Sequence, residues 1–305
     1  MKIYAPIAAC MLPLTCIPLA TTVLAADHPP TPNEILAKSP DGAWLKIADD
    51  DLLVMQLAPD AAGKARRVVI QLMPQPFAQQ WGANIRTLAL AHWWDGTSIN
   101  RVQDNYVVQW GDPTEKKALP DGIVATNETG YAVPFSSVRL MPLPYPDSYA
   151  RKTGFIGGWP VASDGKAAWP LHCYGMVGVG RNLSPDAGTG AELYTVIGQA
   201  PRHLDRNIAL AGRVIAGMEY LSSLPRGTGT LGFYEDPAQR IAITSVRLAS
   251  DLPEAERPHY LVMDTDSDSF SAYAHARANR DDDFFIRPAG GVDICNVPVP
   301  VTVAK

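Results

Sequence analysis

The chain has 305 residues, of which 47% are hydrophobic and 19% charged, a composition typical of a globular protein with a sizeable core. Its 27 Pro and 24 Gly residues interrupt helical patterns and favour a mostly-β fold. A formal net charge of −5 and the lack of a Lys/Arg run argue against a protein that binds nucleic acid through its phosphates.

The first 26 residues, MKIYAPIAACMLPLTCIPLATTVLAA, combine Lys2, an uncharged apolar stretch and two small residues at the end. This order is typical of a secretory signal peptide that is cleaved near Ala25 or Ala26. A membrane anchor is the alternative, but three prolines interrupt the stretch. We therefore expect a secreted or periplasmic protein with no membrane span after cleavage.

Residues 27–50 are polar and rich in proline, and they predict an N-terminal arm. The segments DLLVMQLA and RRVVIQLMP predict two successive strands. In FAQQWGANIRTLALAH, apolar residues recur at spacings of three and four, which predicts a helix over residues 77–92. Residues 98–112, SINRVQDNYVVQWGD, predict a strand because they are rich in Ile, Val and Tyr, although Arg101 and Gln109 interrupt them.

The second half of the chain continues the pattern of strands. Residues 113–172 are irregular and are interpreted as an insertion within the same domain. The segments YGMVGVG, AELYTVIGQ, IALAGRVI and RIAITSVRLA predict strands, and AGMEYLSSL predicts a short helix. Residues 250–305 contain one helical pattern and two candidate strands, and form a C-terminal extension.

Two cysteines, Cys173 and Cys295, remain after removal of the leader. In an oxidising compartment two such thiols often form a disulfide. The alternative is a pair of independent buried thiols, and the sequence leaves both open. A disulfide would tie the C-terminal extension to the middle of the chain.

The order of these elements and two motifs resemble the cyclophilin-type peptidyl-prolyl isomerases from about Val54 to Ala249. INRVQDNYVVQWGDP meets the family's block F-H-R-(V/I)…F-x-x-Q-G-G-D-P. AELYTVIGQAPRHLDRNIALAGRVIAGME meets the later block S-Q-F-F-I…L-D…F-G-x-V-x-x-G-M. The resemblance implies a closed eight-stranded antiparallel β-barrel capped by two helices over residues 51–249, with residues 250–305 packed on the barrel.

The resemblance also implies which residues act. Arg101 is the catalytic donor, and Gln109 orients the arginine and the substrate carbonyl. The substrate-binding residues implied are Tyr106, Val107, Gly180, Glu192, Tyr194, His203, Leu204 and Ile208.

This residue set suits rotation about an X-Pro bond, whose barrier of about 20 kcal/mol arises because the amide loses its resonance. No covalent bond is made or broken, so neither a nucleophile nor a metal nor a cofactor is required. A guanidinium supplies a donor that stays protonated at any working pH.

Five positions depart from the family pattern. Asn100 replaces a histidine, Glu192 brings a negative charge in place of a glutamine, and Tyr194 adds a hydroxyl to an apolar slot. Ile208 removes a polar group, and His203 replaces the tryptophan of cyclosporin-sensitive members. These changes bear on the catalytic rate and on inhibitor binding, not on the fold.

We therefore expect an isomerase that acts on proline-containing segments of exported proteins and assists their folding. The alternative is a catalytically weak or inactive cyclophilin-fold module that binds such segments. A metal-dependent hydrolase is disfavoured, because the pair His172–Cys173 has no second pair at ligand spacing. The acidic stretch DTDSDS (264–269) lacks the glycine and the distal glutamate of a calcium loop, so no metal site is predicted.

Overall fold

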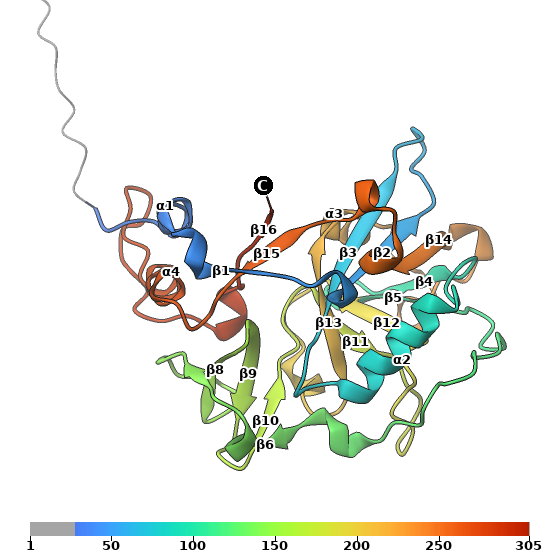
Figure 1. Cartoon of the computed structure of the whole chain (residues 1–305), viewed down its shortest axis with the longest axis horizontal. Helices are drawn as coiled ribbons and strands as arrows, with labels where there is room; N and C mark the ends of the chain where they lie inside the picture. The colour runs from blue at the N-terminus through green and yellow to red at the C-terminus, as the bar shows by residue number, and fades with distance from the viewer. Residues whose placement is uncertain (1–27, 305) are drawn as a thin grey trace, which may run out of the picture.

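The computed structural model of the chain describes residues 28–304, so the predicted signal peptide lies outside the described residues. Eight antiparallel strands close into a barrel in the order β11-β12-β5-β4-β14-β2-β3-β13 (Figure 1). They are β2 (Leu52–Leu57), β3 (Arg66–Leu72), β4 (Ser98–Val102), β5 (Val107–Gly111), β11 (Met176–Val179), β12 (Leu193–Val196), β13 (Leu210–Ala216) and β14 (Ile241–Leu248). The predicted fold class is confirmed.

Two helices flank the barrel, α2 (Gln79–Leu90) and α3 (Met218–Ser222). The helix predicted over residues 77–92 is present as α2, with shorter ends. Its residues Trp81, Ile85 and Leu88 are buried in the main core, because their spacing of three and four places them on one face.

Residues 98–112 are not one strand, as the sequence pattern predicted, but a hairpin of β4 and β5. The chain reverses at residues 103–106, where Asn105 takes a left-handed conformation with φ of 50°. Asn tolerates this conformation better than most residues do. The hairpin places Arg101 directly opposite Gln109 in the ladder.

The insertion at residues 113–172 contains a second, five-stranded antiparallel sheet in the order β6-β10-β9-β8-β7. Its strands are β6 (Val133–Pro134), β7 (Met141–Pro142), β8 (Lys152–Ile156), β9 (Trp159–Ser163) and β10 (Ala167–Pro170). Phe155, Trp159 and Trp169 are buried in the same core cluster as the barrel residues. The sheet and the barrel therefore share one core.

The N-terminal arm and the C-terminal extension lie together, with their helices at the end of the molecule away from α2 (Figure 1). Strands β1 (Trp44–Lys46), β15 (Tyr260–Met263) and β16 (Val301–Val303) form one sheet, next to helices α1 (Pro32–Lys38) and α4 (Asp268–Ala278). The arm thus carries a helix that the sequence analysis missed. Its signal was the stretch TPNE, because Thr31 and Glu34 form a reciprocal capping box.

The extension is attached to the rest of the molecule in two ways. Val262 of β15 packs in a small buried cluster with Leu52 and Val54 of the barrel. In addition, the structure joins Cys173 and Cys295 in a disulfide. The acidic stretch 264–269 begins α4, where the Ser267 hydroxyl accepts a hydrogen bond from the Phe270 N–H.

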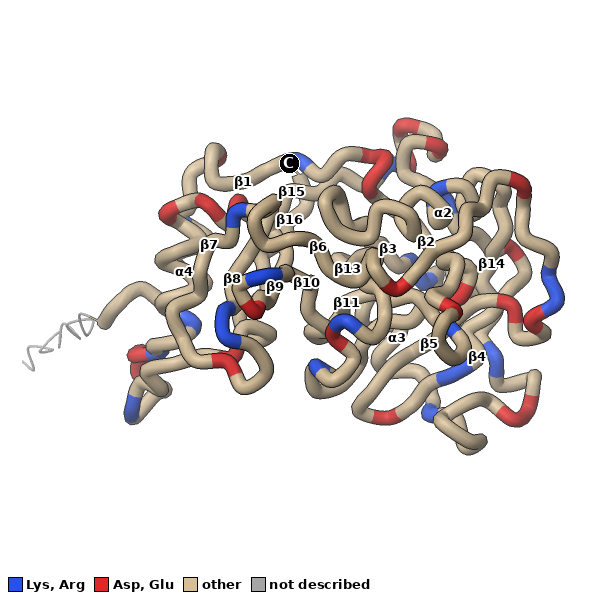
Figure 2. The backbone as a smooth tube through the Cα atoms, turned by 90° about the horizontal axis from the view of Figure 1, so that it is seen from below, with Lys and Arg blue, Asp and Glu red and all other residues tan. Residues whose placement is uncertain are grey.

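Basic and acidic residues are interspersed along the described chain and do not gather by sign in the view of Figure 2. None of the helices within residues 28–304 has the length and apolar character needed to cross a membrane.

Candidate active site

The candidate site lies where β4, β5 and β12 run side by side in the barrel. In the ladder, Gln109 of β5 pairs with Tyr194 of β12. Side chains alternate between the two faces of a strand, so Val107 shares a face with Gln109, and Glu192 shares a face with Tyr194. The two short motifs of the sequence therefore meet on one surface.

Arg101 and Gln109 form a hydrogen-bonded pair on this surface. Arg101 Nη1 donates to Gln109 Oε1 at 3.0 Å, and Arg101 Nε donates to the carbonyl oxygen of Leu231 at 2.7 Å. Nη2 contacts the side-chain oxygen of Gln103. Within residues 28–304 these are the hydrogen bonds of the guanidinium, so two of its five N–H groups remain for a ligand. Burial lowers the pKa of Arg101, but a guanidinium in a protein keeps its charge.

Aromatic rings hold the guanidinium from two directions. The Arg101 Cζ atom lies 5.7 Å from the centre of the Tyr106 ring and 5.4 Å from that of the Phe233 ring. His203 stacks on Tyr106, with a distance of 6.2 Å between the two ring centres. Arg101 is thus fixed by cation–π contacts as well as by hydrogen bonds.

Beside this pair lies an apolar cluster that is separate from the main core. It consists of the buried residues Val107, Tyr194 and Val196 and the half-buried residues Tyr106 and Ile208, which we call the apolar patch. Four of these five were predicted, and Val196 was not. Leu204 is half-buried on the turn Arg202–Leu204 and is not part of this cluster.

The hydroxyl of Tyr194 does not make the apolar patch polar. It is bonded to Nε2 of the buried His172 at 2.8 Å. Gly178 leaves the space that the hydroxyl needs, because a Cβ atom there would lie 2.3 Å from it. The ring therefore faces the patch while its polar end lies in the interior. His172–Cys173 is no metal pair, since Cys173 is in the disulfide and His172 is hydrogen-bonded at both ring nitrogens.

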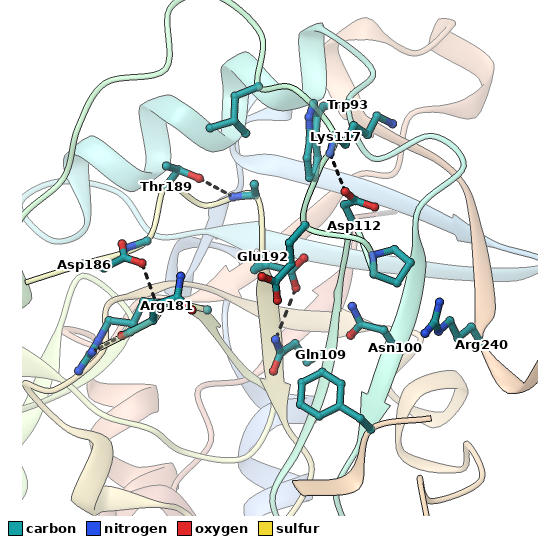
Figure 3. A pocket seen from close by; sticks show the side chains of 18 residues that line it. Trp93, Asn100, Gln109, Asp112, Lys117, Arg181, Asp186, Thr189, Glu192 and Arg240 are labelled. Carbon is teal, nitrogen blue, oxygen red and sulfur yellow. Dashed lines mark hydrogen bonds between the residues drawn. The ribbon is translucent and has the colours of Figure 1, made fainter. Parts of the chain in front are cut away.

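Gly180 and Glu192 lie in a neighbouring pocket of about 390 Å³, not in the apolar patch. Figure 3 shows Glu192 above Gln109, with Asn100 and Arg240 along the adjoining wall. Gln109 Nε2 donates to the Glu192 carboxyl at 3.5 Å. Among the described residues, Asn100 Oδ1 has no hydrogen-bond partner, although the residue is buried.

The carboxyl of Glu192 is poorly solvated. Burial raises its pKa to about 7, and the carboxylates of Glu115 and Asp112 act in the same direction. Its charge therefore changes near neutral pH, next to the Arg101–Gln109 pair. Asp112 itself is a loop former, because its carboxylate accepts the backbone N–H groups of Thr114, Lys116 and Lys117.

Sequence reasoning missed the loop at residues 227–234, which supplies Leu231 and Phe233 to the site. The loop approaches the hairpin closely: a Cβ atom on Gly232, whose φ is +81°, would lie 2.7 Å from Gln103 Cα. The closely spaced glycines of RGTGTLGF were the available signal for such an approach. Within residues 28–304, no three His, Cys, Asp or Glu side chains are grouped so that they could hold a metal ion.

The chain is similar to known proteins both in sequence and in fold. Residues 54–248 match the family model "Cyclophilin type peptidyl-prolyl cis-trans isomerase/CLD". The crystal structure of cyclophilin AquaCyp293 from Hirschia baltica is similar, with a TM-score of 0.67, 24% identity and coverage of 89% of this chain and 96% of that chain. A Cryptosporidium parvum cyclophilin-type isomerase matches with a TM-score of 0.36, 13% identity and coverage of 65% and 96%. No curated protein matches the chain.

Proposed function

Because the chain belongs to the cyclophilin-type peptidyl-prolyl cis-trans isomerase family, we propose that it turns over X-Pro bonds of exported, partly unfolded proteins and so assists their folding. The observation that carries the proposal is the Arg101–Gln109 pair beside the apolar patch. Two guanidinium N–H groups of Arg101 have no partner among the described residues. The patch offers a surface for the pyrrolidine ring, and the guanidinium lies where the prolyl amide would follow.

Arg101 acts by favouring the twisted amide over the planar one. When the C–N bond twists, resonance is lost and the prolyl nitrogen gains a lone pair that can accept a hydrogen bond. A donor aimed at this nitrogen stabilises the transition state more than the ground state, which is what raises a rate. An increase from about 0.01 to about 100 per second requires roughly 5.5 kcal/mol. A charged hydrogen bond in a partly desolvated site, together with burial of the proline ring, is of that order.

Gln109 has a defined orientation in this scheme. Its Oε1 accepts from Arg101, which leaves Nε2 to donate to a substrate carbonyl. Glu192 competes for that donor through its 3.5 Å contact. This contact is the observation that favours the second candidate function, a module that binds proline-containing segments with little or no turnover.

Two features support the assignment to exported clients. The first 26 residues have the order of a secretory leader. The Cys173–Cys295 disulfide is of the kind that persists in oxidising compartments.

The test is cis-to-trans exchange of a short X-Pro peptide with the chain that follows the leader, with Arg101→Ala beside the parent. We expect the parent to accelerate exchange and the variant to lose about 100-fold in kcat/KM, as when an enzyme loses a transition-state donor. A parent that binds the peptide without exceeding the uncatalysed rate would establish the binding module instead. For the clients, the parent should accelerate the proline-limited refolding of a disulfide-containing exported protein, and no acceleration there would contradict that part.

A further inference from the structure

A chain of buried polar side chains leads from the apolar patch to the insertion. Tyr194 Oη bonds to His172 Nε2 at 2.8 Å, and His172 Nδ1 bonds to Asp205 Oδ1 at 3.0 Å. Arg202 Nε donates to Asp205 Oδ2 at 2.5 Å, and Arg202 Nη1 donates to Asp147 Oδ1 at 2.9 Å. We call these five residues the buried network.

The side chains of the buried network are almost inaccessible to solvent. The exposed fractions are 1% for His172, 6% for Asp205, 2% for Arg202 and 4% for Asp147. Polar groups buried this deeply must find partners inside the protein, and their bonds are strong where water is excluded. When a side chain at one end of the buried network moves, its bonded neighbour must therefore move with it, because solvent does not replace the lost partner.

The direction of the bonds is fixed by chemistry. Burial lowers the pKa of His172, so the ring is neutral at physiological pH. Since a carboxylate only accepts, His172 Nδ1 carries the proton that is donated to Asp205, and Nε2 accepts from the Tyr194 hydroxyl. Burial raises the pKa of Tyr194 well above its usual value, so the hydroxyl keeps its proton.

The far end of the network belongs to the insertion. The Asp147 carboxylate also accepts the backbone N–H groups of Tyr149 at 2.9 Å and Ala150 at 2.8 Å. The Tyr149 ring covers Arg202, whose Cζ atom lies 5.0 Å from the ring centre. The position of Arg202 is therefore set by residues 147–150, between β7 and β8.

We propose that residues 147–150 of the insertion orient the Tyr194 ring through the buried network, with Asp147, Arg202, Asp205 and His172 as positioning residues for the isomerisation. The inference rests on the proposed function, in which Tyr194 forms one wall of the proline surface. A ring anchored at its hydroxyl cannot swing out of the patch, and small misplacements at a reacting centre are costly. Stability alone does not account for buried charges, because apolar side chains of similar size stabilise as well or better.

The test is a double-mutant cycle on kcat/KM with Asp147→Asn, Tyr194→Phe and the double variant. Asp164→Asn is the matched control: Asp164 also accepts two backbone N–H groups in the insertion and pairs with an arginine, but it is 46% exposed. Tyr149→Leu, which removes an exposed ring from Arg202, replaces Asp147→Asn if that variant does not fold. Arg101→Ala is measured in parallel.

We expect Asp147→Asn to lower kcat/KM at least threefold in the parent but not in the Tyr194→Phe background, since the route ends at the hydroxyl. Asp164→Asn should leave kcat/KM unchanged in both backgrounds. Equal effects of Asp147→Asn on kcat/KM in the two backgrounds, or no effect in either, would overturn the inference. The proposed site would still be upheld if Arg101→Ala lowers kcat/KM. Full activity of Arg101→Ala would instead overturn the proposed site and this inference with it.

Discussion

Two regions of the barrel each carry an arginine bonded to a glutamine side chain, but they differ in what surrounds them. At the candidate site, Arg101 bonds to Gln109 across a hairpin, and two of its N–H groups have no partner in the described part of the chain. Where the insertion covers the barrel, Arg213 donates twice to Gln71 Oε1, at 2.9 and 2.7 Å, and once to the Gly158 carbonyl at 2.8 Å. Arg213 also lies 4.5 Å from the Trp159 ring centre.

On this difference we base the proposal that Arg101 is catalytic and Arg213 structural. Arg213 is 8% exposed and its bonds hold β3, β13 and the turn between β8 and β9 together. Arg101 is only half-buried, and two of its N–H groups have no partner within residues 28–304. In the proposed function, the same pair of residue types therefore serves catalysis at one place and stability at the other.

The largest expected effect on the free energy of unfolding comes from the Cys173–Cys295 disulfide. Cys173 and Cys295 are 122 residues apart, so reduction should release a large loop and lower the free energy of unfolding by about 4 kcal/mol. The measurement is urea unfolding of the double variant Cys173→Ser/Cys295→Ser against the parent. A difference below about 1 kcal/mol would show that the extension is held by packing alone.

Arg213→Ala should have the next largest effect. It leaves Gln71 Oε1 and the Gly158 carbonyl buried without their donor, at a cost of about 3 kcal/mol in unfolding free energy. Arg280→Ala serves as the control, because its ion pair with Asp282 is at the surface and should contribute less than about 1 kcal/mol. Equal losses for the two variants would contradict the structural role of Arg213.

A smaller effect on the free energy of unfolding is expected at Glu192, and this effect depends on pH. The pKa of about 7 in the folded chain exceeds the ordinary value of 4.5, so the unfolded chain releases the proton more readily. The parent should therefore lose stability relative to Glu192→Gln as the pH rises from about 4.5 through 7. A shift of this size corresponds to about 3 kcal/mol, which solvent screening of the partly exposed carboxyl reduces to about 2 kcal/mol.

Urea unfolding of both proteins at pH 5 and pH 8 measures this difference. Glu192→Gln should also raise kcat/KM at pH 8, by about threefold, because the charge no longer competes for Arg101 and Gln109. A fall in kcat/KM would mean that the carboxylate orients Gln109 productively.

Local patterns predicted most strands of the barrel, whereas the closed barrel and the roles of Arg101 and Gln109 were implied by the resemblance to a family. Alternating and apolar segments marked the strands, and the eight-residue spacing of Arg101 and Gln109 matched a family motif. The turn at residues 103–106 was missed because its Asp-Asn dipeptide lacks the glycine of the strongest two-residue hairpin signals.

Other parts of the site could not be predicted because they depend on distant contacts. The Leu231 carbonyl meets Arg101 across 130 positions, and Asp205 meets His172 across 33. Strand β1 has three residues, too few for a periodic signal, whereas two strands were expected in the extension that holds β15 and β16. The pairing of these strands follows from the tertiary structure that brings the N-terminal arm and the C-terminal extension together.

The most direct test of the central claim measures kcat/KM on one X-Pro peptide and the free energy of unfolding for the parent, Arg101→Ala and Arg213→Ala. The account predicts opposite outcomes: Arg101→Ala loses about 100-fold in kcat/KM with little change in stability, whereas Arg213→Ala loses stability and keeps its rate per folded molecule. If Arg101→Ala keeps the kcat/KM of the parent, Arg101 is not the catalytic donor. The same follows if kcat/KM per folded molecule falls by the same factor in both variants.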